Sequence, residues 1–136
     1  MNKDVLKTHL TWVIQRRMDK NNQILNKGKE KMISDFAHFF QFDSLSHFKL
    51  VEENKRLAEL ILQVEDADEQ NLRQEMVYGR NFYLKKIMQN NNFHSTTVYM
   101  VNIANSCNAE VDKDLYTFYE GLVNIVDKYN KNSHGQ

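Results

Sequence analysis

Two carboxylate–histidine pairs are the side chains whose spacing best suits chemistry. Asp35 precedes His38 by three residues, and Asp43 precedes His47 by four. Within a helix, both spacings put the two side chains on one face, where they could bind a metal ion or act as a general base. A metal site in a helical bundle needs further inward carboxylates, and no second helix repeats this spacing. We expect ordinary histidines, no metal and no cofactor; a helical metal protein or enzyme is the alternative.

The residues that other kinds of catalysis need are missing or too far apart in the sequence. Cys107 is the single cysteine, and the nearest histidine, His94, lies about three helical turns upstream. We expect its thiol to be buried and inert, because a reactive cysteine needs a nearby histidine or another cation. One cysteine allows no internal disulfide and no zinc site of paired cysteines. The four glycines are scattered, whereas phosphate-binding loops need them clustered. The sequence therefore predicts a protein that is not an enzyme.

Charge is segregated along a chain whose 18 basic and 18 acidic side chains cancel. Residues 1–31 carry eight basic and three acidic side chains, and residues 32–75 carry four basic and ten acidic. Such runs are solvated faces, or pair with each other, in many proteins. They can also meet a partner, because opposite charges steer encounter and fix orientation. Head-to-tail association of two copies, or a homodimer, is open as well.

Two patches are predicted to bind a partner protein. Trp12 lies off the apolar stripe of the first expected helix and next to basic residues, and Trp and Arg are the residue types that anchor interfaces. The second patch is the acidic end of the third expected helix. Together the patches comprise Trp12, Arg16, Arg17, Lys20, Glu65, Asp66, Asp68 and Glu69. Tyr78, Tyr116 and Tyr119 could extend such a surface.

A nucleic-acid-binding regulator is the main alternative. The basic N-terminal segment could neutralise phosphates, and such binding would fall steeply with salt. The second and third expected helices superficially suggest a helix-turn-helix, but the would-be recognition helix carries Glu52, Glu53 and Glu59, which would repel the phosphate backbone. The zero net charge also argues against a nucleic-acid binder.

Helices account for the whole expected fold. The chain has no proline, so turns fall to Asn and Asp, as at Asn21–Asn22 and Asp66–Asp68. Apolar residues at helical spacing predict about six helices, near residues 4–25, 29–41, 44–65, 68–89, 96–107 and 112–129. Residues 97–103 have the β-branched and aromatic character of a strand, which is the alternative there, but the chain offers no partner strand. The predicted fold is all-α, a single compact bundle joined by short polar turns, with residues 1–129 as one domain and 130–136 as a frayed tail.

Particular residues inside these helices carry further predictions. Gly79 and Gly121 each cost about 1 kcal/mol relative to Ala in a helix, so we expect both at helix crossings; a ligand against the backbone is the alternative. The third helix is expected to have an apolar face that comprises Leu45, Phe48, Val51, Ala58, Ile61 and Leu62. The aromatic run Phe36, Phe39, Phe40, Phe42 and Phe48 is expected mainly in the core, with some members exposed.

The size, the missing chemistry and the segregated charge together predict a non-enzymatic protein that binds another protein. An inhibitor, an immunity factor or a regulatory adaptor would suit these features. The abundance of Asn, Lys and Ile is typical of AT-rich coding sequence, as in phages and mobile elements. The N-terminus lacks the apolar stretch of a signal peptide and no apolar run could span a membrane, so we expect a cytoplasmic protein without a membrane partner.

Overall fold

Four long helices make up the part of the chain that the structure describes. The computed structural model describes residues 3–34, 44–91 and 99–134. The α-helices are α1 (Lys3–Ser34), α3 (Ser44–Asp66), α4 (Leu72–Asn91) and α5 (Tyr99–His134), with a short 3-10 helix, η1 (Glu69–Asn71), between α3 and α4. These residues contain no strand, which confirms the all-α prediction for them. No helix among them is apolar over enough of its length to cross a membrane.

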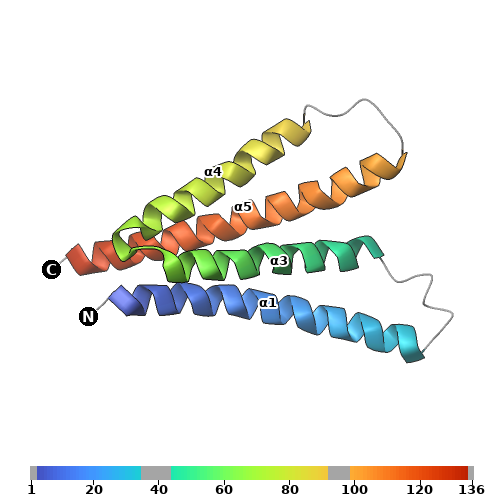
Figure 1. Ribbon diagram of the computed structural model, residues 1–136, viewed down its shortest axis with the longest axis horizontal. Coiled ribbons are helices and arrows are strands. Elements are labelled where there is room, and N and C mark those ends of the chain that lie inside the picture. The colour runs from blue at the N-terminus through green and yellow to red at the C-terminus, as the bar shows by residue number, and fades with distance from the viewer. Residues whose placement is uncertain (1–2, 35–43, 92–98, 135–136) are drawn as a thin grey trace.

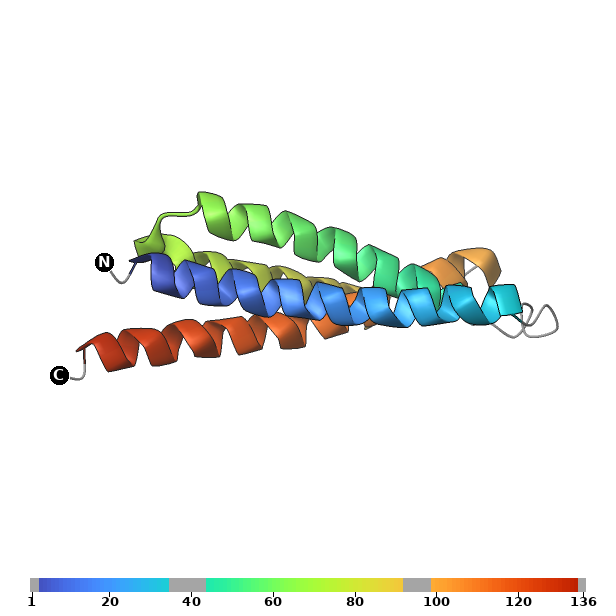
Figure 2. The ribbon, with the colours of Figure 1, turned by 90° about the horizontal axis from the view of Figure 1, so that it is seen from below.

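The helices alternate in direction and pack as two antiparallel hairpins (Figure 1). Helices α1 and α3 form one hairpin and α4 and α5 the other, and the hairpins meet mainly through α3 and α5. In the view of Figure 2, α1 lies in front of the other helices, with α3 above it and most of α5 below it. Both termini lie at the same end of the molecule as η1 (Figure 1). Helix α1 therefore has close contact with α3 along one flank and much less with α5 along the other.

Apolar side chains from all four helices, two of them tyrosines, form one core between the hairpins. Its buried members are Leu6, Leu10, Ile14, Leu57, Leu60, Val64, Leu72, Met76, Tyr83, Val111, Leu115, Tyr119, Leu122, Val123 and Val126. Each fully buried aliphatic side chain contributes about 1.5 to 3 kcal/mol through the area it removes from water. These contributions fix the rotation of each helix about its own axis, and so decide which side chains face solvent.

The prediction of about six helices is wrong, since the first two expected helices are joined in α1. Helix α1 passes without a break through Asn21, Asn22 and Gly28. Asn21 is buried, and its amide donates hydrogen bonds to Glu53 and Asn54 on α3 instead of forming a turn. A single helical glycine costs about 1 kcal/mol, which is too little to end a helix that packs along its length. Residues 35–41 of the expected second helix lie outside the described residues.

The last two expected helices are likewise one continuous helix, α5. The sequence predicts a helix that begins at Asp112, but this carboxylate lies inside α5, is buried and accepts a hydrogen bond of 2.7 Å from Arg56 Nη1 on α3. No glycine or proline interrupts the helix at this point. From Tyr99 onward the ambiguous segment is helical, and residues 96–98 lie outside the described residues. At its other end α5 continues past 129 to His134.

Helix α3 buries a different face from the one that the sequence predicts. Leu57, Leu60 and Val64 point into the core, whereas Phe48 and Leu62 are 63% and 66% exposed. The helix carries two apolar rows on opposite sides, and helical spacing alone cannot say which of them meets the other helices. The buried row lies between α1 and α5, and the second row is left in solvent.

Candidate functional site

An open groove runs between α1 and α5, the two neighbouring helices that pack least closely. Its volume is about 390 Å³. Two residues of α1 and six of α5 line it: Val13, Arg17, Asp114, Thr117, Phe118, Gly121, Leu122 and Ile125. The groove exists because each helix is held chiefly by its own hairpin partner, α3 for α1 and α4 for α5. It is the flank along which another element can pack.

The floor and one wall of the groove are apolar. Val13 of α1 and Phe118 and Ile125 of α5 are half-buried, and Leu122 between them is fully buried. These partly exposed apolar side chains pack against the core from outside. An apolar partner that covered them would complete their burial and gain about 25 cal/mol for each Å² removed from water.

Gly121 sits in the wall of this groove with its backbone facing open space. A Cβ placed there would have no other atom within 4 Å. The prediction that Gly121 marks a helix crossing is therefore wrong within the described residues. The prediction is confirmed for Gly79, where a Cβ would collide with the ring of Tyr119 across the α4–α5 contact. Of the two glycines, Gly121 alone leaves room for a partner against the helix backbone.

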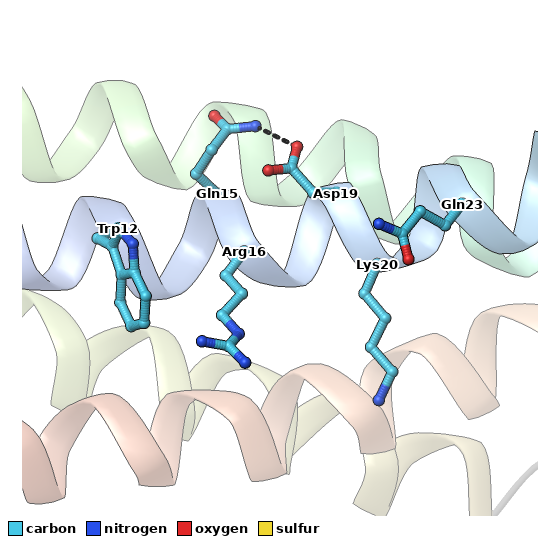
Figure 3. Close-up of a pocket in the computed structure, with 6 residues that line it drawn as sticks. All are labelled: Trp12, Gln15, Arg16, Asp19, Lys20 and Gln23. Carbon is cyan, nitrogen blue, oxygen red and sulfur yellow. Dashed lines mark hydrogen bonds between the residues drawn. The ribbon is translucent and has the colours of Figure 1, made fainter.

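A basic and aromatic rim borders the groove on α1. Trp12 is 54% exposed, and the guanidinium of Arg16 lies 5.2 Å from the centre of its ring. Figure 3 shows Trp12, Arg16 and Lys20 pointing to one side of α1, while Gln15 and Asp19 point to the other and share a hydrogen bond of 3.0 Å. Together with Gln23 these side chains border a surface hollow of about 650 Å³. Arg16 and Lys20 form no ion pair with another described residue, so their charges are free to meet a ligand.

Arg17 belongs to the interior more than to this rim. Its Nε and Nη2 donate hydrogen bonds of 3.1 and 3.0 Å to the two carboxylate oxygens of Glu53, which is only 1% exposed. Asn21 also donates to Glu53, and the guanidinium of Arg17 lies 5.7 Å from the ring centre of Phe118. Arg17 thus joins α1, α3 and α5 and holds the groove wall in place.

An ion-pair cluster lies at the Asp114 end of the groove. Lys49 Nζ on α3 lies 2.9 Å from Asp114 and 3.3 Å from Glu110, both on α5. The hydrogen bond to Asp114 is the largest influence on Lys49 and raises its pKa above the ordinary value. Lys49 offsets one of these two carboxylate charges, so this end of the groove is less acidic than Asp114 and Glu110 alone would make it.

The acidic patch lies apart from the basic one. Glu65 and Asp66 end α3, and Asp68 and Glu69 are at the start of η1, at the end of the molecule that holds both termini (Figure 1). Lys7 of α1 reaches this end and donates a hydrogen bond of 3.1 Å to the backbone carbonyl of Glu65. The structure therefore does not combine the two predicted patches into one surface.

The remaining candidates divide between exposed, buried and undescribed positions. Tyr78 is exposed on α4, Tyr116 is half-buried, and Tyr119 is buried, so the three tyrosines do not form one surface. His47 is half-buried on α3 beside the ring of Phe48. Outside the described residues lie Asp35, His38 and Asp43, along with Phe36, Phe39, Phe40 and Phe42; the side chain of Cys107 is not described. Where the structure is described, no three metal-ligating side chains come together.

The residue types in the sequence identify the rim of the groove but not its floor. Trp12, Arg16 and Lys20 stand out by residue type and by their position off the apolar stripe. Phe118, Leu122 and Ile125 look like ordinary core residues in the sequence, and only the packing shows that two of them remain half-exposed. The one local signal was Gly121, a costly residue in a helix that no other helix crosses.

No protein-family model, curated protein or solved structure matches this chain significantly. Its function must therefore be inferred from its own geometry.

Proposed function

We propose that this protein is a non-enzymatic protein-binding module whose α1–α5 groove holds an amphipathic helix with an acidic edge. The observation that carries the proposal is an apolar groove bordered by cations that have no ion-pair partner among the described residues. An inhibitor, an immunity factor or a regulatory adaptor works by such stoichiometric binding. A cytoplasmic location and a phage or mobile-element origin stay predictions from the sequence.

The shape and chemistry of the groove suit a helix. A helix binds in a groove by laying its apolar face on an apolar floor, here Val13, Phe118 and Ile125. The missing side chain at Gly121 lets the backbone of the incoming helix approach α5 closely. Trp12 and Arg16 at the rim are of the types that supply most of the binding energy at interfaces.

The charge of the rim selects the partner. Arg16 and Lys20 would meet carboxylates along one edge of the bound helix, which fixes its orientation and speeds its association. Nucleic acid is the weaker candidate, because Arg17 is committed to Glu53 and the floor of the groove is apolar. Phosphate binding needs a row of free cations, and an apolar floor contributes nothing to it.

An affinity capture with matched variants tests the proposal. The tagged protein is used to capture partners from a lysate of its source cells, beside Gly121→Arg, which puts a long side chain into the groove at a position where a Cβ has no other atom within 4 Å. The control is Gln74→Arg, which adds the same side chain at an exposed position on α4. We expect a stoichiometric protein that wild type and Gln74→Arg retain and Gly121→Arg loses. A partner retained equally by all three would remove the groove from the proposal.

A further inference from the structure

Helix α3 presents a second apolar row to solvent, opposite the face that it buries. Phe48, Val51, Lys55, Ala58 and Leu62 follow one another at alternating spacings of three and four, and all five are exposed. This spacing is the seam of a coiled coil, in which successive side chains stay on one line toward a partner helix. We call these five residues the α3 stripe. Four apolar or small positions around one lysine make a surface that soluble proteins usually cover.

One edge of the α3 stripe is acidic. Glu52 and Glu59 each lie one position after a member of the stripe, on the same side of it, and Asp66 continues the row one heptad later. Glu52 is paired with Arg56, but Glu59 is exposed and forms no ion pair with another described residue. An amphipathic helix with an acidic edge is the ligand proposed for the α1–α5 groove.

We propose that the α3 stripe of one copy of this chain binds in the α1–α5 groove of a second copy. This inference rests on the proposed function, since it names the partner of that same groove. Charge complementarity supports it, because the exposed carboxylate of Glu59 would face the basic rim of Arg16 and Lys20. Small residues support it as well: Ala58 lies near the middle of the stripe, and Gly121 lies in the groove wall without a neighbour, so the two helices can approach closely there.

A symmetric contact between two α3 stripes is much less favourable. Lys55 lies midway between Phe48 and Leu62. Two copies of the stripe would therefore set Lys55 against Lys55 in either a parallel or an antiparallel pair, and like charges at the seam destabilise it. An antiparallel pair would also place the two acidic edges against each other. The charges thus favour binding between two different surfaces.

The positions of the two surfaces determine the kind of assembly. The stripe lies on the face of α3 opposite its buried side chains, whereas the groove lies between α1 and α5, so the two surfaces face different directions. Contacts between two different surfaces join copies head to tail, and they form either a closed ring or an open chain. Each molecule in such an assembly uses its groove for one neighbour and its stripe for another.

Two variants, each altered at one surface, test this arrangement. The groove variant is Gly121→Arg, and the stripe variant combines Phe48→Ser with Leu62→Ser at positions that are exposed and outside the core. Circular dichroism first checks that both fold. Light scattering after size exclusion then measures the mass of wild type, of each variant and of their mixture, from micromolar to millimolar concentration. Gln74→Arg is again the control, since α4 carries neither surface.

We expect wild type and Gln74→Arg to self-associate. Each surface variant should be monomeric at concentrations where wild type is associated, because it weakens its one contact by about tenfold or more. The mixture forms a one-to-one dimer of twice 16.2 kDa, because the stripe of the groove variant still fits the groove of the stripe variant. A monomeric wild type overturns the inference. So does a groove variant that still dimerises, which would mean a symmetric contact through α3.

The two proposals fail in distinguishable ways. If wild type is monomeric while Gly121→Arg still loses a captured partner, self-assembly is overturned and the groove keeps its proposed function with a foreign helix. If Gly121→Arg changes neither self-association nor capture, the groove binds nothing and both proposals are overturned.

Discussion

The guanidinium of Arg17 donates two hydrogen bonds to the buried carboxylate of Glu53, one of 3.1 Å from Nε and one of 3.0 Å from Nη2. Asn21 supplies a further donor to the same carboxylate, and Phe118 lies against the guanidinium from α5. This one side chain therefore ties α1 to α3 and sets the position of α1 beside α5. Both the stability of the fold and the width of the groove depend on it.

Removing one member of this pair should cost far more stability than replacing both. Arg17→Ala leaves a buried carboxylate without its cation, and we expect the free energy of unfolding to fall by about 2 to 3 kcal/mol, less than for a fully buried pair because Arg17 is partly exposed. The double variant Arg17→Met with Glu53→Leu removes both charges and should recover most of that loss. Urea denaturation measures each value, with Arg16→Ala as the control at an exposed neighbour. A double variant as unstable as the single one would contradict this account of the pair.

Gly79 and Gly121 should respond in opposite directions to the same change. Gly121→Ala improves helix propensity and meets no neighbour, so we expect it to stabilise the protein by up to about 1 kcal/mol. Gly79→Ala gains the same propensity but forces a methyl group into the buried ring of Tyr119, and overpacking of this kind costs about 1 to 3 kcal/mol. Thermal and urea unfolding of the two variants under identical conditions measure the difference. Equal effects of the two changes would mean that α4 can move away from α5 at no cost.

The sequence predicts the class of fold well and the number and faces of its helices poorly. Apolar spacing locates helical residues correctly, because a helix must bury one side whatever its partners. It cannot tell a polar residue that ends a helix from one that bonds across helices. Asn21 looks like a turn residue and Asp112 like the start of a helix, and both are buried in contacts with α3.

Helix α3 shows the same limit at the level of whole faces. Its two apolar rows are nearly equivalent in sequence, and only the fit against α1 and α5 buries the row that contains Leu57 and leaves Phe48 in solvent. The candidate site divides in the same way. Trp12 and Arg16 could be found from residue type, but the groove floor depends on the distance between two helices, which no local pattern encodes.

Buried tyrosines should make the protein sensitive to alkaline pH. Burial raises the pKa of Tyr119 well above its ordinary value of 10.0, and burial raises that of Tyr83 too. The unfolded chain then loses these protons at a lower pH than the native protein. Below about pH 10 both states keep these protons, so the free energy of unfolding does not change with the titration of these tyrosines. Above about pH 10 the unfolded chain ionises first, so the free energy of unfolding falls as the pH rises.

The variant Tyr119→Phe tests this sign directly. The free energy of unfolding, measured by urea between pH 8 and pH 11, should fall less steeply above pH 10 in the variant than in wild type. Tyr78→Phe, at an exposed ring on α4, controls for the loss of a hydroxyl and should follow wild type. Parallel profiles for Tyr119→Phe and wild type would show that the native protein opens before this ring ionises.

The basic rim should govern the rate at which a partner binds. Reversing Arg16 and Lys20 together, to Arg16→Glu and Lys20→Glu, leaves the core unchanged because both side chains are exposed. We expect the association rate constant for a captured or self-associating partner to fall by about tenfold at low salt, with a smaller change in the dissociation rate constant. The difference from wild type should shrink as salt rises, since screening weakens the steering that wild type has and the variant lacks. Lys85→Glu on α4 is the control, and surface plasmon resonance at several salt concentrations gives both rate constants. If the rim variant binds as fast as the control at every salt concentration, Arg16 and Lys20 do not face the partner, and the orientation proposed for the bound helix is wrong.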